Sequence, residues 1–291
     1  MADGTAIEWT HRPGTKGETW NPTTGCDRIS PGCDNCYALK LAKRLKAMGS
    51  VKYQNDGDLR TSGPGFGVTA HSDALAQPLR WRSPRTVFVN SMSDLFHARV
   101  PREFVVRVWD VMSRTPQHTY QILSKRPERM ARVVSGLPDG LRELPLPNVW
   151  LGTSVESDNY VRRVDDLRAT PAEVRFLSAE PLLGPLPSLD LAGIDWLIVG
   201  GESGPGARPI DPGWVRDLRD RCLDAGVPFF FKQWGEWVHR DQMPEETYVG
   251  LDQAINLSQA HPEPFRVGKK RAGRLLDGRT WDEYPEVTDE R

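Results

Sequence analysis

The sequence contains no long hydrophobic run and no excess of charge of either sign. Its longest apolar runs, such as WLIVG and VPFFF, extend over only a handful of residues, whereas a membrane helix needs about 20. A membrane-spanning protein is therefore excluded. The 38 Lys and Arg residues nearly balance the 39 Asp and Glu residues, which leaves a net charge of −1. Because no overall positive field would attract nucleic acid or an anionic membrane, any such contact must be local.

A secretion signal is also lacking, since the first residues, MADGTAIEWTHRPG, are polar. We therefore expect a cytoplasmic protein. Cysteine is scarce, with four in 291 residues, and these are too few for a disulfide scaffold of this length. In a reducing compartment, clustered cysteines more often indicate metal or redox chemistry. Three of the four are clustered, namely Cys26, Cys33 and Cys36, with six and then two residues between them.

Short apolar runs alternate with helical patterns along the chain. The runs begin at Val87, Tyr120, Val149, Val174, Trp196 and Pro228. They are largely apolar rather than alternating, which is typical of strands covered on both faces in a parallel sheet. Helices are expected over residues 37–48, 101–114 and 213–225, where apolar side chains recur on one face. The alternation predicts an α/β fold, a parallel TIM-like (β/α) barrel that is either partial, with six strands, or complete, with eight.

A doubly wound open sheet is the competing architecture, but no Gly-rich turn follows the first predicted strand. We expect residues 1–291 to form a single barrel domain, with an irregular extension from about residue 238, where periodicity is lost. The stretch GKKRAGRLLDGRTWDE near the end is locally basic. A solvated face is the more common interpretation of such a stretch, and a nucleic-acid patch is the alternative.

Polar and ionisable side chains recur at the C-terminal ends of the predicted strands. Barrel active sites are built at that end, so these side chains are expected to share one rim. The simpler interpretation is that any strand must end in polar loop residues. The recurring positions include Asn90, Ser93, Asp94, Lys125, Ser154, Glu156, Glu180, Glu202 and Lys232.

The segment WNPTTGCDRISPGCDNCYALK carries the three clustered cysteines in one Gly- and Pro-containing loop. Three thiolates from such a loop can ligate three irons of a [4Fe–4S] cluster and leave the fourth iron open. Zinc is the alternative, but a structural zinc site needs a fourth protein ligand, which would be His11, His71 or Cys222. Cys222 lies on the apolar face of its predicted helix and is expected to be a buried small hydrophobic residue. Unligated thiols are the third interpretation.

The loop, with Tyr37 after its third cysteine, resembles radical S-adenosylmethionine (SAM) proteins, especially those akin to spore photoproduct lyase. The segments VFVNSMSDLFH, QILSKRPERMARV and VWLGTSVES continue this resemblance. From AIEWT to WDEYP the chain also resembles a phage-associated three-Cys family of unknown function, through NSMSDLFH, KRPERM, EPLLGP, VGGESGPGARP and FFKQWGEW. Two features differ from most radical SAM loops, which place three residues between the first two cysteines and often an aromatic residue where Asn35 stands here.

The resemblance implies a [4Fe–4S] cluster on Cys26, Cys33 and Cys36, with SAM bound to the open iron. Reductive cleavage of SAM would then give a 5′-deoxyadenosyl radical that abstracts hydrogen from a substrate, and the barrel would position the cofactor and exclude water. The rim residues implied to bind the SAM amino group are Asn90, Ser93 and Asp94, and those for the ribose hydroxyls are Ser154 and Glu156. Helix capping by Ser93 or Asp94 and a solvated turn at Glu156 are the structural alternatives.

Further rim residues carry weaker assignments. Backbone N–H groups at Gly200, Gly201 and Glu202 could approach the cofactor or a phosphate, with Arg208 as counter-charge, although a tight turn explains the glycines equally well. Lys125 and Arg126 could bind an anionic substrate or a phosphate, although Arg126 and Pro127 could simply begin the next helix. Glu180 and Lys232 could transfer protons or hold substrate, and a structural Glu–Lys pair is the alternative.

Three functions remain open on the sequence alone. The first is a radical SAM enzyme acting on an unknown substrate, with a nucleobase or nucleic acid as the candidate class. The second is a non-catalytic binding protein stabilised by an iron–sulfur cluster or zinc. The third is a barrel hydrolase or lyase that uses Asp94, Glu180 and Lys232. The resemblance also implies that a separate three-Cys-motif partner protein could accompany this chain.

Overall fold

A computed structural model describes residues 4–141, 145–245, 247–248 and 263–286. Within them the main sheet has seven strands in the order β1-β4-β5-β6-β7-β8-β9. Their bounds are β1 Lys16–Thr19, β4 Arg85–Val89, β5 Thr119–Ser124, β6 Val149–Ser154, β7 Val174–Ala179, β8 Trp196–Gly200 and β9 Phe229–Gln233. The pairs β1–β4, β4–β5, β5–β6 and β8–β9 are all parallel. The predicted α/β fold with a partial (β/α) barrel is confirmed, with seven strands rather than six or eight.

The chain divides into two compact units. Unit 1 comprises Met1–Ser154 and Arg162–Leu177, and unit 2 comprises Val155–Val161 and Ser178–Arg291. Strands β1, β4, β5 and β6 therefore belong to unit 1, and β8 and β9 belong to unit 2. The single domain expected from the sequence stays a prediction.

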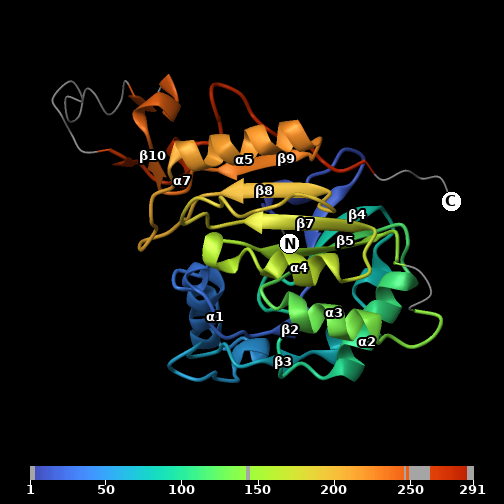
Figure 1. Ribbon diagram of the computed structural model, residues 1–291. Helices are drawn as coiled ribbons and strands as arrows, with labels where there is room; N and C mark the ends of the chain where they lie inside the picture. Colours follow the sequence, from blue (N-terminus) through green and yellow to red (C-terminus); the bar gives the residue numbers. More distant parts are fainter. Residues whose placement is uncertain (1–3, 142–144, 246, 249–262, 287–291) are drawn as a thin grey trace. The chain divides into compact units, whose positions relative to one another are not determined.

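The helices of unit 1 are α1 Tyr37–Ala47, α2 Arg102–Ser113, α3 Pro127–Ser135 and α4 Arg163–Arg168. Helix α2 buries the apolar face that the sequence predicts, whereas α1 buries Ala38 and Ala42 and leaves the predicted Leu41 and Met48 exposed. Helix α2 begins directly after Pro101 and buries Phe104, Val105, Val108 and Met112. Helix α3 packs against α4 (Figure 1). Helix α4 packs in turn against β6. Every residue of β6 is buried, as expected of a strand covered on both faces.

Short elements complete unit 1. They are the antiparallel pair β2 Thr23–Thr24 and β3 Thr69–Ala70 and the 3₁₀ turns η1 Glu8–Thr10, η2 Pro31–Cys33, η3 Val51–Tyr53, η4 Ser72–Ala74 and η5 Pro78–Arg80. The ring of Trp9 in η1 packs edge-on against Phe88 of β4, with centroids 4.7 Å apart, and lies 6.0 Å from Phe176. An added Cβ on Gly152 would lie 2.5 Å from the Phe176 ring. Glycine at this position therefore lets the aromatic side chain lie on the strand.

In unit 2, helix α5 Pro212–Ala225 ends where the sequence predicts and begins one residue earlier. The Asp211 side chain accepts a hydrogen bond from the Gly213 N–H at 2.6 Å, and Pro212 occupies the first turn. Gly226 ends the helix with a φ of 66°, a left-handed conformation that glycine adopts at little cost. Cys222 is fully buried on this helix, as expected. Helix α5 runs alongside β9 (Figure 1). The turn η6 Asp158–Tyr160 is also in unit 2.

The irregular extension expected after residue 238 consists of short elements where it is described. They are β10 Trp237–Val238, η7 Arg240–Gln242, β11 Phe265–Arg266 and α7 Lys269–Ala272. The last part of the extension pairs with β9: the Phe231 N–H donates to the Trp281 carbonyl, and the Glu283 N–H donates to the Phe229 carbonyl. This segment covers backbone groups of β9 that would otherwise form an exposed sheet edge.

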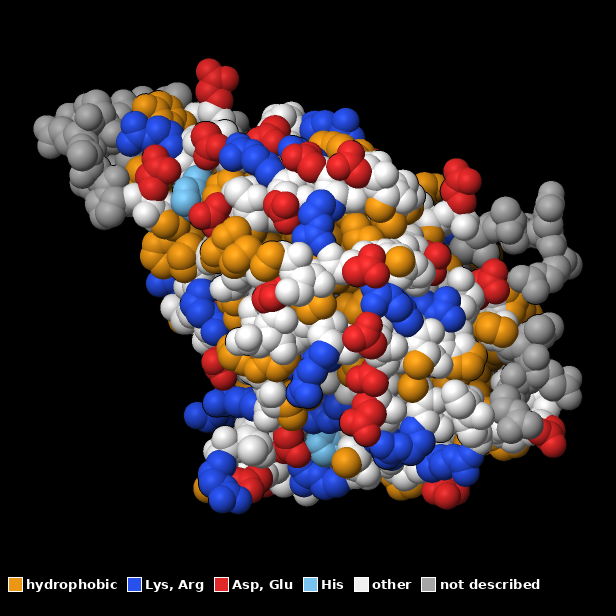
Figure 2. Space-filling view, in the orientation of Figure 1, with side chains coloured by type: hydrophobic (Ala, Val, Ile, Leu, Met, Phe, Trp, Pro, Cys, Tyr) orange, Lys and Arg blue, Asp and Glu red, His pale blue; other side chains and the backbone are white. Residues whose placement is uncertain are grey.

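Charge is distributed without a dominant sign. On the face drawn in Figure 2, acidic and basic side chains are interspersed, as expected from the net charge of −1. None of the helices in the described part of the chain combines the length and hydropathy that a membrane crossing needs.

Asp277 joins the extension to α5 and gives unit 2 a pH-dependent contact. Its carboxylate accepts hydrogen bonds from Arg216 at 2.7 Å, from Gln242 at 3.0 Å and from Arg219. The Arg216 hydrogen bond is the main reason why the pKa of Asp277 lies below its usual value, and Arg219 and Gln242 lower it further against the effect of burial. Asp277 also has a positive φ of 52°, which asparagine tolerates as well.

We expect Asp277→Asn to reduce the free energy of unfolding by about 1 kcal/mol at pH 7, because the contact is partly exposed. A carboxyl group with a lowered folded-state pKa stabilises the fold above its unfolded pKa of about 3.9, and this stabilisation is lost as the pH falls toward the folded value. The difference between the wild type and the variant should therefore shrink between pH 5 and pH 3 in urea titrations. A difference that stays constant over this range would contradict the assignment.

Candidate functional site

The three-cysteine loop is held at the carboxyl end of β4. The Gly25 N–H donates to the Met92 carbonyl at 3.0 Å, and Gly25 forms a parallel bridge with Ser93. The Tyr37 hydroxyl, at the start of α1, donates to the Ser91 carbonyl at 2.5 Å. Both ends of the loop are thus fastened to the segment that follows β4, which is the end of a parallel strand where barrel sites are built.

The three thiols lie near one another, and two of them are largely shielded from solvent. Cys26 and Cys36 pack against the buried cluster formed by Ala38, Ala42, Tyr53, Phe66 and Met92. Burial raises the pKa of the Cys26 thiol to about 12, with Asp94 adding to the rise and Arg126 opposing it. Burial also raises the pKa of Cys36. Cys33 is close enough to add to the rise at both neighbours.

The residues fit a metal cluster in their chemistry. Three thiols on one loop are the soft ligand set that iron–sulfur clusters and zinc prefer, and a cationic guanidinium lies against one of them. In the described ranges, no three His, Cys, Asp or Glu side chains already surround a common point at metal-binding distance.

Arg126 makes a polar contact to the first of the cysteines. Its Nη1 atom lies 3.4 Å from Sγ of Cys26 and 2.9 Å from Oδ2 of Asp94, and Nη2 donates to the Asp27 carbonyl at 3.3 Å. Asp94 also accepts from the Ser124 hydroxyl at 2.8 Å, and from the N–H groups of Phe96 at 3.0 Å and Lys125 at 3.2 Å. Both carboxylate oxygens of Asp94 are therefore engaged within the protein, and its expected contact to SAM stays a prediction.

Asn90 and Ser93 form a small polar cluster with Thr23. Asn90 Nδ2 donates to the Ser93 hydroxyl at 2.6 Å and to the Thr23 hydroxyl, and the Ser93 and Thr23 hydroxyls are 2.7 Å apart. Asn90 is buried, and its Oδ1 atom has no hydrogen-bond partner among the described residues. A buried acceptor without a partner is costly, unless a ligand with N–H or O–H groups satisfies it.

A second group of ion pairs lies beside Cys26 and was not predicted from the sequence. Asp27 accepts hydrogen bonds from Arg99 at 2.6 Å, from the Thr61 hydroxyl at 2.8 Å and from His97 Nε2 at 3.0 Å. Although burial opposes the shift, these three donors lower the pKa of Asp27. Burial lowers the pKa of His97, and Arg126 lowers it further. The only sequence signal for this group is the position of Asp27 next to the first cysteine.

The other predicted site residues of unit 1 stand at strand ends. Lys125 follows β5 directly, and its side chain is half-buried. Ser154 is the buried last residue of β6, and its carbonyl accepts from the Arg163 guanidinium at 2.9 Å.

In unit 2, Glu180 and Lys232 form the ion pair that the sequence offers as an alternative. Lys232 Nζ lies 2.5 Å from Glu180 Oε1, and both side chains are largely buried. Gly200 lies beside them, because an added Cβ would stand 3.4 Å from Glu180 Cδ and 3.4 Å from Lys232 Cβ. A proton can pass directly between two groups at this distance.

The Gly-rich segment after β8 is tightly packed. Both carboxylate oxygens of the buried Glu202 accept from the Arg208 guanidinium, at 2.7 and 2.9 Å. An added Cβ on Gly201 would lie 1.9 Å from the Trp234 carbonyl oxygen. Arg208 therefore neutralises Glu202. The sequence had suggested that Arg208 would be the counter-charge for a phosphate. Glu156 is fully buried, and its backbone carbonyl accepts from the Leu183 N–H at 2.7 Å.

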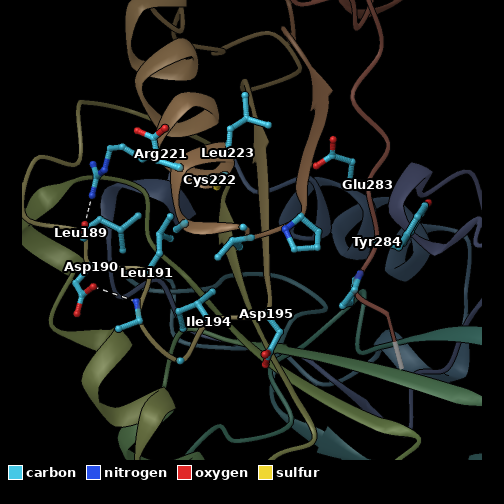
Figure 3. A pocket seen from close by; sticks show the side chains of 18 of the residues that line it. Leu189, Asp190, Leu191, Ile194, Asp195, Arg221, Cys222, Leu223, Glu283 and Tyr284 are labelled. Atoms are coloured by element: carbon cyan, nitrogen blue, oxygen red, sulfur yellow. Dashed lines mark hydrogen bonds between the residues drawn. The ribbon is translucent and has the colours of Figure 1, made fainter. Parts of the chain in front are cut away.

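Unit 2 also has a groove of about 1160 Å³, shown in Figure 3. Its walls are residues 189–195, the C-terminal part of α5, and residues 283–286. Arg221 lies in the groove, where it donates to the carbonyl oxygens of Leu186 and Leu189. None of the predicted site residues lines this groove, so it is separate from the candidate chemistry.

Several solved structures resemble this chain at low sequence identity. Spore photoproduct lyase complexed with dinucleoside spore photoproduct is 12% identical, with a TM-score of 0.41 over 66% of this chain and 58% of the lyase chain. A mutant of spore photoproduct lyase is 11% identical, with a TM-score of 0.45 over 77% of this chain and 78% of the mutant. No curated protein sequence matches the chain.

A family model describes nearly the whole chain. It matches residues 4–285 and therefore includes the three-cysteine loop, both units and most of the described extension. The phage association implied by the sequence resemblance stays a prediction. The chain belongs to the family described as "Protein of unknown function (DUF5131)".

Proposed function

We propose that this protein is a radical SAM-type enzyme that holds a [4Fe–4S] cluster on Cys26, Cys33 and Cys36. The observation that carries the proposal is a loop of three neighbouring thiols fastened to the carboxyl end of β4, with a guanidinium against the first of them. A cluster with three protein ligands leaves one iron open to SAM and supplies the electron that cleaves it.

The surroundings of the thiols favour an anionic group. Thiolate ligands give an iron–sulfur cluster negative charge, and the Arg126 guanidinium provides a positive charge and a hydrogen bond at Cys26. The apolar cluster beneath Cys26 and Cys36 restricts access of water to the loop. Shielding of this kind protects a reactive species from side reactions with water.

Asn90 and Ser93 would recognise SAM. Both lie in the segment after β4 to which the cysteine loop is fastened. The buried Asn90 Oδ1 atom can accept a hydrogen bond, and an ammonium group such as that of SAM can donate one. Asp94 would act on the same ammonium through its charge. Ser154 and Glu156 remain assigned to the ribose hydroxyls, and Gly200, Gly201 and Glu202 to the rest of the cofactor.

Lys125, Glu180 and Lys232 would bind the substrate or transfer protons to it. In the Glu180–Lys232 pair, Lys232 Nζ donates a hydrogen bond to Glu180 Oε1. It can transfer this proton to Glu180 or to the substrate. The candidate substrate is a nucleobase, free or within a nucleic acid, and Lys125 could bind a phosphate of it. We place the protein in the reducing cytoplasm, where cluster cysteines stay reduced, and a three-Cys-motif partner protein belongs to the same proposal.

The test is an anaerobic reconstitution of the full chain with iron and sulfide, followed by reduction and EPR spectroscopy. We expect a [4Fe–4S] signal whose g-values change when SAM is added, together with the release of 5′-deoxyadenosine. Nucleosides and single-stranded oligonucleotides added in parallel would identify the substrate class by faster release. A cluster signal that SAM leaves unchanged, or tight binding of zinc in place of iron, would contradict the proposal and favour a metal-stabilised binding protein.

A further inference from the structure

The Arg126 guanidinium connects the cysteine loop to a buried carboxylate. Its Nη1 atom lies 3.4 Å from Sγ of Cys26 and 2.9 Å from Oδ2 of Asp94. Both side chains are shielded, with 14% of Arg126 and 8% of Asp94 exposed. Charges so far removed from solvent interact with their neighbours more strongly than surface charges do.

The position of Arg126 is determined by the protein itself. Asp94 is fixed by the Ser124 hydroxyl and by the N–H groups of Phe96 and Lys125, and the Arg126 N–H donates to the Ser124 hydroxyl at 2.9 Å. Arg126 also directly precedes α3, in which Pro127 occupies the first turn. The guanidinium is therefore preorganised beside Cys26 by contacts that involve no ligand.

We propose that Arg126 and Asp94 act as an opposed pair that sets the reduction potential of the cluster on Cys26, Cys33 and Cys36. This inference rests on the proposed function. Arg126 is a positioning and tuning residue, since it acts through the sulfur of Cys26.

The expected effects of the two residues have opposite signs. Reduction adds one negative charge to the cluster, which a nearby cation stabilises and a nearby anion destabilises. A hydrogen bond to a ligating sulfur also stabilises the reduced form, and net charge and such hydrogen bonds are the main determinants of iron–sulfur potentials. Arg126 should therefore raise the potential. Asp94 should lower it, although it also holds Arg126 in place.

The experiment is an EPR-monitored redox titration of the reconstituted full chain without SAM. At the midpoint potential of the wild type, we expect Arg126→Gln to lower the ratio of reduced to oxidised cluster about tenfold, which is about 59 mV for a one-electron couple. Arg126→Lys keeps the positive charge, so its midpoint potential should lie between those of the wild type and Arg126→Gln. Asp94→Asn should shift the midpoint in the positive direction, and the double variant should lie between the two single variants.

Arg99→Gln is the matched control, because it also removes one guanidinium from the loop region. Arg99 binds Asp27 at 2.6 Å and is half exposed, so its loss should change the midpoint much less than that of Arg126. Iron content and circular dichroism would show that each variant folds and holds its cluster. An unchanged midpoint in Arg126→Gln, or shifts of the same sign in Arg126→Gln and Asp94→Asn, would overturn the inference while leaving the proposed function intact. A wild-type chain that binds no iron would overturn both.

Discussion

Replacing Cys26, Cys33 or Cys36 with alanine should abolish iron binding and SAM cleavage. The reconstituted wild type should hold about four iron atoms per chain. Each single substitution leaves only two thiols on the loop. Loss of an outer-shell partner already lowers metal affinity by about 10–100-fold, so the loss of a direct ligand should cost more. Iron and acid-labile sulfide assays after gel filtration, with chromatography of 5′-deoxyadenosine, measure both outcomes.

Cys222→Ala provides the matched control for these substitutions. Cys222 is fully buried on α5, so its replacement should cost about 1 kcal/mol of stability through lost packing and leave the iron content unchanged. Retention of four iron atoms in the Cys26, Cys33 or Cys36 variants would contradict the assignment of these cysteines as cluster ligands. If the loop variants lose stability but their folded fraction keeps SAM-dependent turnover, the metal has a structural role alone.

Gly25→Ala should strongly destabilise unit 1 and displace the cysteine loop. Gly25 has a φ of 87°, and an added Cβ would stand 2.2 Å from the Gly67 carbonyl oxygen and 2.4 Å from its carbon. Backbone atoms cannot move aside as a side chain can. The left-handed conformation and the overpacking together should cost about 2–5 kcal/mol. Because Cys26 is the next residue, the iron content should fall as well.

Gly49→Ala separates these two contributions. Gly49 follows the end of α1 and has a similar φ of 77°, but apart from its chain neighbours no atom in the described part of the chain lies within 4 Å of its added Cβ. It should therefore show only the conformational cost, about 1–2 kcal/mol, with normal iron binding. Urea unfolding followed by tryptophan fluorescence, together with iron assays, compares the two variants. Equal stability losses in both would mean that the close approach of Gly25 to Gly67 does not constrain the loop.

Local patterns in the sequence predicted most of the regular structure. Six of the seven strands coincide with largely apolar runs, since strands covered on both faces consist mostly of apolar residues. Strand β1 was not predicted, because Lys16–Thr19 reads KGET and carries no apolar signal. It is a strand because its backbone pairs in parallel with β4 from Arg85 to Phe88. Tertiary pairing here overrides local propensity.

The candidate site divides in the same way. The sequence alone determined that three thiols share one loop and that polar residues follow the strands, since spacing and strand ends are local features. Only the tertiary structure brought Arg126 to Cys26, 100 residues away, and engaged both oxygens of Asp94. It also left Asn90 Oδ1 without a hydrogen-bond partner among the residues that the structure describes. It further brought Lys232 to Glu180, a pair that the sequence offered only as one alternative. Such contacts depend on the register of parallel strands joined by long crossovers, and residue spacing along the chain does not encode which side chains that register brings together.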